Sequence, residues 1–151
     1  MTPLKQWICD TCGELIKKPE EGWFEWLEDH NGAHSFKIVH HATSSPKQRG
    51  CYQYDNNPDV CDGHLDSYVG SEKLPFLYQF LDTGPIVGSK TRVQQSNIPA
   101  FTEILRRLTL PYYEEARIYW SKAKSDGEFD EANEVSPYLK LQDFVDRWRL
   151  A

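Results

Sequence analysis

The pattern of apolar and polar positions divides the chain into a strand-like first part and a helix-like second part. Residues 22–27 read Gly-Trp-Phe-Glu-Trp-Leu, a run rich in the aromatic side chains that strands favour. Residues 35–41 form a second run of this kind, and Asn31-Gly32 lies between the two. Because an Asn-Gly pair adopts the tight turn that joins antiparallel strands, we predict a β-hairpin here. Shorter strands are expected at residues 5–9, 15–16 and 51–54.

From about residue 62 onward, the apolar residues recur at the spacing of helices. The clearest case is the C-terminal segment, where Tyr138, Leu141, Val145 and Trp148 lie three or four positions apart, the period of one buried helix face. We predict helices over residues 71–81, 97–108, 109–124 and from 136 onward, joined by an extended connection over 83–95 and an acidic loop over 125–134.

The chain is long enough to bury a core of its own. Its 151 residues include five Trp, eight Tyr and seven Phe, and each aromatic ring removes a large apolar surface from water when it is buried. We therefore predict a globular protein with an α+β fold. Residues 1–60 are expected to form a small β-rich unit and residues 61–151 a region of about four helices, the two packing together as one compact domain.

The charge of the chain is acidic and evenly spread. The formal net charge is −6; residues 1–60 hold six Lys and Arg against nine Asp and Glu, and residues 61–151 hold eleven against fourteen, so each part carries −3. A protein that binds nucleic acid through its phosphates usually carries a basic patch or domain. The charge distribution therefore disfavours a nucleic-acid partner, although zinc modules are common scaffolds for such binders.

The sequence carries no recognisable targeting segment. The first eight residues lack the long apolar core of a signal peptide, and no apolar run reaches the length of a membrane span. We therefore expect a cytoplasmic protein with no membrane partner. In that compartment thiols stay reduced, so the four cysteines are expected to be free rather than paired in disulfides.

The strongest chemical signal is the run Cys9-Asp10-Thr11-Cys12-Gly13, directly after a short apolar stretch. Two thiolates separated by two residues can reach one zinc ion, and the glycine that follows permits the tight turn that points both sulfurs inward. A structural zinc site is tetrahedral and closed, so two further ligands are required. We predict that a structural Zn²⁺ organises the N-terminal part of the chain.

The remaining ligands are expected from the end of the second hairpin strand and the segment after it. His40 and His41 are adjacent there, and strand alternation does not decide between them. Cys51 follows after a polar loop, whereas Cys61 and His64 offer a rival pair with two-residue spacing. Because the first arrangement lies wholly within the β-rich part, we predict the metal ligands from Cys9, Cys12, His40 or His41, and Cys51.

Two resemblances to known families bear on the role of these residues. The run Trp7 to Gly13 resembles the zinc knuckle of zinc-ribbon and treble-clef proteins over about a dozen residues, which implies a structural zinc. The order His40-His41, Asn56-Asn57 and Cys61-Asp62-Gly63-His64 is similar to that of HNH nucleases. That second resemblance implies His41 as the general base, Asn56 as an orienting residue and His64 as a ligand of a catalytic divalent ion.

The sequence favours a non-enzymatic function. A closed zinc site leaves no coordination position for chemistry, and we predict no catalytic residues and no organic cofactor. An acidic, aromatic-rich protein of this kind is expected to act by binding another protein, as an adaptor, regulator or inhibitor. The alternatives are an HNH-like metal-dependent nuclease and a nucleic-acid-binding zinc module.

Overall fold

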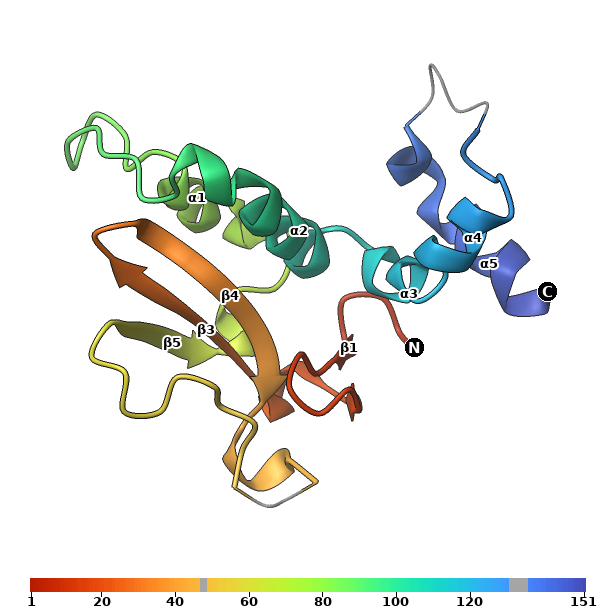
Figure 1. Cartoon of the computed structure of the whole chain (residues 1–151), viewed down its shortest axis with the longest axis horizontal. Helices are drawn as coiled ribbons and strands as arrows, with labels where there is room; N and C mark the ends of the chain where they lie inside the picture. Colours follow the sequence, from red (N-terminus) through yellow and green to blue (C-terminus); the bar gives the residue numbers. More distant parts are fainter. Residues whose placement is uncertain (47–48, 131–135) are drawn as a thin grey trace.

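The computed structural model describes residues 1–46, 49–130 and 136–151 and has an α+β architecture, which confirms the predicted fold class (Figure 1). Two small antiparallel sheets come from the first 64 residues, and the helices follow. The strands are β1 (Trp7–Ile8), β2 (Leu15–Ile16), β3 (Gly22–Asp29), β4 (Gly32–His40) and β5 (Val60–His64). The α-helices are α1 (Leu74–Leu77), α2 (Ile98–Thr109), α3 (Tyr113–Arg117), α4 (Trp120–Ser125) and α5 (Leu141–Leu150).

The larger sheet is built on the predicted hairpin. Its strand order is β4-β3-β5, and β3 pairs antiparallel with both neighbours. The hairpin turn lies at Asn31-Gly32, where Gly32 has a φ of +76°, a conformation that favours glycine. A β-bulge between Glu25 and Leu27 interrupts the β3–β4 register.

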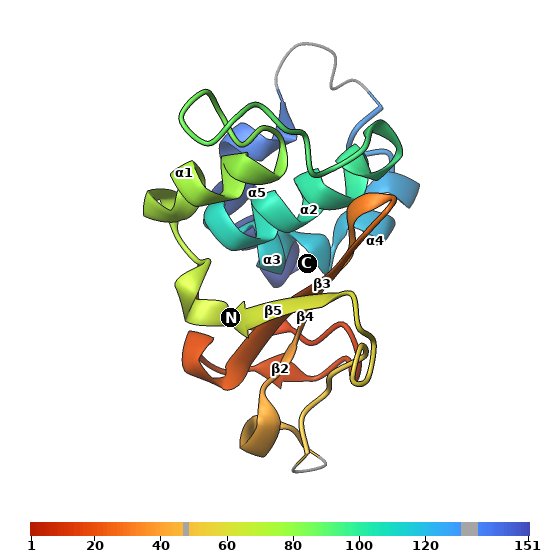
Figure 2. The ribbon, with the colours of Figure 1, turned by 90° about the vertical axis from the view of Figure 1, so that its left-hand side faces the viewer.

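The two faces of this sheet have different environments. One face carries Phe24, Trp26 and Ile38, which are buried in the main core together with Phe80 and Phe101 from the helical part. Figure 2 shows helices α1 and α2 covering this side of the sheet. The other face is lined by Trp23 and Glu25, and the irregular segment 51–57 crosses it. We call it the polar face, and it holds several of the candidate functional residues.

Several predicted elements differ from the observed ones. We expected helical spacing from about residue 62, but Val60–His64 forms strand β5. These residues have little apolar character, and they form a strand by pairing with β3, which the local pattern does not indicate. Residues 51–54 do not form a strand; the amide of Gln53 donates to the buried carboxylate of Glu25 (2.8 Å) instead of to a neighbouring backbone. Part of the predicted loop over 125–134 lies outside the described residues.

The predicted helices are shorter and more broken than their periodicity suggested. The helix over 97–108 is confirmed as α2, with Pro99 in its first turn. The segment 71–81 instead splits into α1 and two flanking 3-10 turns. The segment 109–124 holds two helices, α3 and α4. Tyr112, with a left-handed φ of +68°, separates α3 from α2, and a break after Arg117 separates α3 from α4. A 3-10 turn over Pro137–Lys140 precedes α5.

The hydrophobic side chains gather in two clusters rather than one. The main core runs from Trp7 to Leu108 and includes strands of both sheets with α2, whereas a second cluster contains Tyr113, Ala116, Phe144 and other side chains of α3, α4 and α5. We call the second unit the helical lobe; in Figure 1 it lies to one side of the sheet and α2. The boundary between the two clusters lies near residues 109–112, and the predicted units 1–60 and 61–151 stay a prediction. No described helix combines the length and apolar character needed to span a bilayer.

A buried ion network joins the two units. The guanidinium of Arg107 on α2 is 3 % exposed. It donates to Glu114 of α3 (2.8 and 3.0 Å) and to Asp10 of the N-terminal segment (2.9 and 3.0 Å). Burial alone would lower its pKa, but the carboxylates of Glu114 and Asp10 raise that pKa above the usual value, so the charge persists. Its Nη2 also donates to the carbonyl of Ile8 (3.1 Å), so that all three guanidinium nitrogens have a partner.

Replacement of Arg107 should therefore cost much more stability than replacement of an exposed arginine. In Arg107→Met the carboxylate of Glu114 stays buried with Arg117 as its one cationic partner and the amide of Ile8 as a neutral donor, and we expect the free energy of unfolding to fall by about 3 kcal/mol. Arg147→Met is the control, because its pair with Glu128 is largely exposed and should contribute less than about 1 kcal/mol. Chemical denaturation measures both; equal losses would contradict the role assigned to Arg107.

Candidate metal centre

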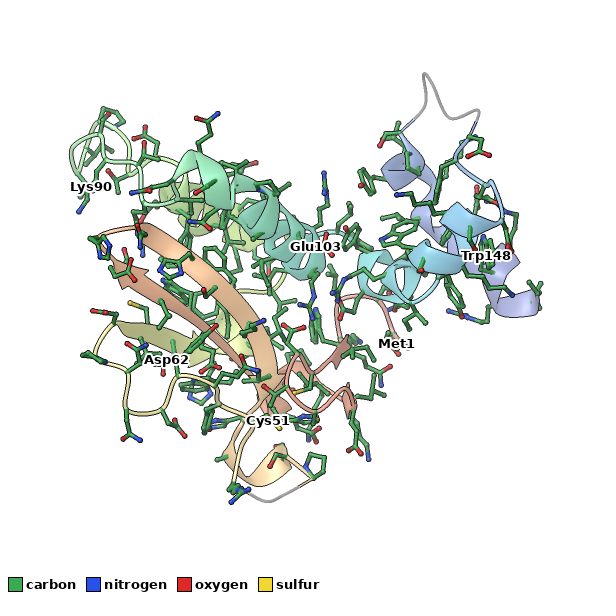
Figure 3. All side chains as sticks on the ribbon, viewed as in Figure 1. Met1, Cys51, Asp62, Lys90, Glu103 and Trp148 are labelled. Atoms are coloured by element: carbon green, nitrogen blue, oxygen red, sulfur yellow. The ribbon has the colours of Figure 1, made fainter. Side chains whose placement is uncertain are left out.

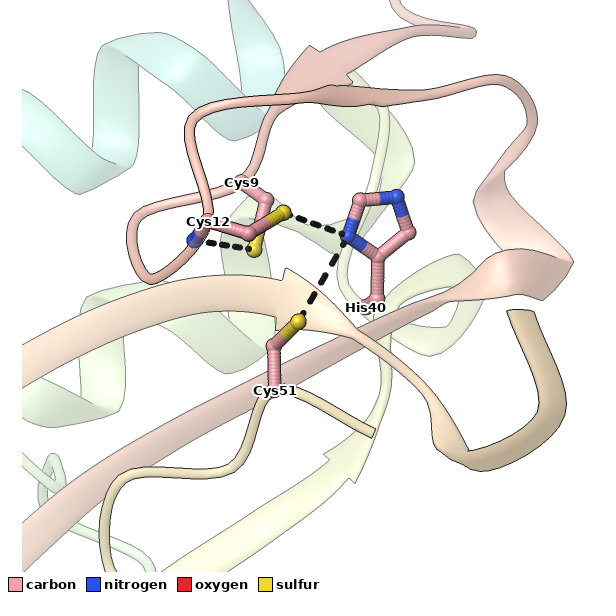
Figure 4. A group of neighbouring side chains, drawn as sticks. All are labelled: Cys9, Cys12, His40 and Cys51. Atoms are coloured by element: carbon pink, nitrogen blue, oxygen red, sulfur yellow. Dashed lines mark hydrogen bonds between the residues drawn. The ribbon is translucent and has the colours of Figure 1, made fainter. Parts of the chain in front are cut away.

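Four ligand-type side chains converge beside the small sheet. The sulfurs of Cys9, Cys12 and Cys51 and a ring nitrogen of His40 all lie within 4.8 Å of one another (Figure 4). His40 Nδ1 lies 3.4 Å from Cys12 Sγ and 3.9 Å from Cys51 Sγ. All four cysteines of the chain are free thiols, so the cluster is not a disulfide. The geometry can hold a metal ion.

Local backbone bonds shape the turn that carries the first two thiols. Strands β1 and β2 pair around it, with Ile8 opposite Leu15. The amide of Cys12 donates to Cys9 Sγ (3.5 Å), and the amide of Gly13 donates to the carbonyl of Cys9 (3.0 Å). Gly13 has a φ of +76°, so a glycine is favoured at the point where the chain turns back. The predicted knuckle turn thus has a physical basis in its own residues.

The other two side chains arrive from β4 and from the segment that follows it. His40 is the last residue of β4, and its carbonyl accepts from the amide of Cys51 (3.1 Å). The hydroxyl of Thr11 donates to the carbonyl of Cys51 (2.7 Å), which ties that segment to the knuckle. Backbone contacts therefore bring residues far apart in sequence to one point.

His40 is oriented as a metal ligand by its second ring nitrogen. The imidazole is 3 % exposed, and its Nε2 lies 3.1 Å from the carbonyl of Leu15. A carbonyl can only accept, so Nε2 carries the proton and Nδ1 presents its lone pair to the three sulfurs. This arrangement of a ligating histidine and a backbone carbonyl is common around protein-bound metals.

The surroundings hold two of the three thiols in the protonated form when no ion is bound. Burial raises the pKa of Cys12, and burial together with the neighbouring thiol of Cys9 raises the pKa of Cys51 to about 12. Burial also opposes ionisation of Cys9, but hydrogen bonds from the backbone amides of Cys12, Thr11 and His40 lower its pKa below the usual value. A bound cation would have to displace the protons of the thiols.

The donor set fits zinc. With Zn–S bonds of about 2.3 Å and Zn–N bonds of about 2.0 Å, a tetrahedral ion separates its donor atoms by about 3.5–3.8 Å. The sulfur–nitrogen distances of 3.4 and 3.9 Å are close to that separation. Three thiolates and one imidazole form a closed structural set, which leaves no position for water or substrate.

His41 lies away from this cluster, on the polar face of the larger sheet. Its ring stacks on Trp23 at 4.5 Å between centroids, and its Nδ1 lies 2.6 Å from the hydroxyl oxygen of Tyr52. The amide of Ala42 donates to the same oxygen (2.7 Å). Burial and the nearby His64 lower the pKa of His41. Of the two adjacent histidines, the structure therefore places His40, and not His41, among the thiols.

The rival residues do not join the cluster either. The thiol of Cys61 lies 3.4 Å from a carboxylate oxygen of Glu28, and burial raises its pKa to about 11. The ring of His64 lies 5.1 Å from that of His41. Asn56 occupies an exposed turn with a φ of +67°. The nuclease roles implied for His41, Asn56 and His64 stay a prediction.

Comparison with known proteins adds no relative. No family model matches the chain, and neither the curated proteins nor the solved structures contain a significant match.

Sequence reasoning missed two contributors to this centre. Asp10, between Cys9 and Cys12, accepts from the amide of Ile38 (2.8 Å) and from Arg107, and so fixes the knuckle against β4 and α2. The hydroxyl of Thr11 holds the segment of Cys51. Both lie within the Cys-x-x-Cys run, but nothing in the run itself indicates their distant partners.

The geometry predicts which substitutions remove the metal. We expect one equivalent of zinc in the purified protein, retained in His41→Ala and Cys61→Ala and lost in alanine variants of the four clustered residues, because removal of any one opens the tetrahedron. Elemental analysis after gel filtration measures the content. Retention in His40→Ala together with loss in His41→Ala would contradict the assignment.

Metal loading should release protons. Near pH 7 the thiols of Cys12 and Cys51 are protonated in the metal-free protein because their pKa values are raised, hence binding should release at least two protons. The apparent affinity should consequently fall as the pH is lowered. Titration calorimetry in buffers of different ionisation enthalpy counts the protons; a heat independent of the buffer would mean that the ion meets thiolates already formed.

Proposed function

We propose that the protein is a non-enzymatic, zinc-stabilised module that acts by binding another protein. The observation that carries this proposal is the closed Cys3His cluster, whose four donors complete a tetrahedron and leave no position for a reacting group. Such an ion stabilises the folded protein and takes part in no reaction. Structural zinc binding contributes on the order of 10–16 kcal/mol in small peptides, which exceeds the net stability of many domains.

An exposed apolar loop supports the interaction role. Residues 83–90, which we call the apolar finger, carry Ile86 and Val87 at 97 % and 76 % exposure. Isolated exposed apolar residues are ordinary, but two adjacent ones at the tip of a loop form an anchor for a partner. In Figure 3 the finger projects beyond the sheet near the labelled Lys90.

The finger is held in shape by bonds across its base. The amide of Thr83 donates to the carbonyl of Lys90 (3.0 Å), and the amide of Lys90 donates to the hydroxyl oxygen of Thr83 (2.9 Å). The hydroxyl of Thr83 also donates to the carbonyl of Gly88. A loop closed in this way loses less conformational entropy on binding than an open chain would. Phe76 and Tyr78, in the helical segment before the finger, are exposed as well (41 % and 52 %).

Variants of the finger test the proposal. Replacement of Ile86 and Val87 by serine should weaken the complex about 10- to 100-fold, the effect of failing to bury an aliphatic side chain, without changing the zinc content or the melting temperature. Leu150→Ser is the matched control, since Leu150 is 89 % exposed at the other end of the molecule. Affinity purification from the native source identifies the partner, and titration with that purified protein measures the affinity.

The outcomes are distinct. A partner retained by the wild type and by Leu150→Ser, but released by the finger variants, would support the proposal. If no protein depends on the finger, or if the control weakens binding equally, the module does not bind through this surface.

A further inference from the structure

A cavity of about 410 Å³ lies where α2 meets the helical lobe. Glu103, labelled in Figure 3, lies at this junction. The cavity is distinct from the metal centre and from the apolar finger, and its volume is typical of sites for small organic ligands. Besides Glu103 and Pro137, its walls are formed by the side chains of Arg106, Tyr113, Trp120, Lys124, Phe129 and Tyr138.

Aromatic rings dominate the walls. Trp120 lies 6.1 Å from Tyr113, 5.7 Å from Phe129 and 6.3 Å from Tyr138 between ring centroids. The interplanar angles of these pairs run from 60° to 78°, so the rings are not stacked flat on one another. A flat aromatic ligand can therefore meet both ring faces and ring edges, the two favourable geometries of aromatic contact.

The polar groups of the cavity leave an excess of positive charge. The guanidinium of Arg106 lies over the ring of Tyr138, 4.4 Å from its centroid. Neither Arg106 nor Lys124 makes an ion pair with any residue in 1–46, 49–130 or 136–151. The carboxylate of Glu103 is already bound by Arg117 (2.8 Å) and by the hydroxyl of Tyr113. Two cations that make no ion pair within the described residues thus border an aromatic slot.

From this arrangement we propose that the cavity binds a small molecule that joins a flat aromatic ring to an anionic group. The ring packs against Trp120 and Tyr138, and the anion meets Arg106 and Lys124. Aryl carboxylates and nucleotides share this chemistry. A cationic ligand is disfavoured by the two like charges, and a neutral ring would leave both cations without a counter-charge.

Two probes of the same shape and different charge test the ligand class. Titration calorimetry compares the affinity of 2-naphthoate with that of its neutral isostere 2-naphthamide, which has the same ring without the negative charge. We expect naphthoate to bind at least tenfold more tightly. Adenosine 5′-monophosphate is the third probe. Tighter binding of the nucleotide would identify a nucleotide site, and tighter binding of naphthoate would identify an aryl carboxylate site. Equal binding of naphthoate and naphthamide, or no binding of either anion at millimolar concentration, would overturn the proposal.

Lys122 and Lys124 lie on the same helix, α4, and Lys122→Gln serves as the matched control for the variants of the cavity cations. Arg106→Gln and Lys124→Gln should each weaken naphthoate about tenfold, whereas Lys122→Gln should change the affinity less than twofold. Lys122 is on α4 as well, but its ammonium lies over Trp148, 5.6 Å from the ring centroid, and does not line the cavity. An unchanged melting temperature confirms that each variant is folded. Equal weakening by all three would show a general charge effect and contradict a built site.

Discussion

The buried guanidinium of Arg107 is the constraint that relates the parts of this protein to one another. It meets Asp10, between Cys9 and Cys12, and Glu114 at the start of the helical lobe. Ile8 takes part with both of its backbone groups, since its carbonyl accepts from Arg107 and its amide donates to Glu114 (3.0 Å). A buried charge is costly unless every donor has a partner, so the three segments are held in a single arrangement.

The same network continues toward the cavity at the junction. Arg117 donates to Glu114 (3.0 Å) and to Glu103 (2.8 Å), and Glu103 accepts from Tyr113. A continuous series of ion pairs therefore runs from the turn beside the metal centre to the cavity wall. The knuckle turn thus also contributes Asp10 to this network, which connects the cysteine–histidine cluster to the helical lobe.

The larger sheet separates the main hydrophobic core from a polar, aromatic face. Its inner face packs on α1 and α2, whereas its outer face gathers Trp23, His41, Tyr52 and His64 around one another. Adjacent residues of an extended chain point to opposite faces. His40 at the end of β4 therefore meets the thiol cluster, and His41, which continues the extended backbone, meets the aromatic group. The cysteine–histidine cluster and the polar face thus lie within a few residues of sequence.

Local signals in the sequence were sufficient for the hairpin at Asn31-Gly32, the knuckle turn at Cys9 to Gly13 and helix α2, because each depends on residues close together in the chain. The tertiary structure decided the rest. The choice of His40 over His41 depends on where β4 ends and on the carbonyl of Leu15. Strand β5 exists because β3 has a free edge, and the partners of the Arg107 guanidinium lie up to 99 positions away. Pairings of this kind depend on which distant backbone and side-chain groups must be satisfied when water is removed, and no short-range pattern encodes that requirement.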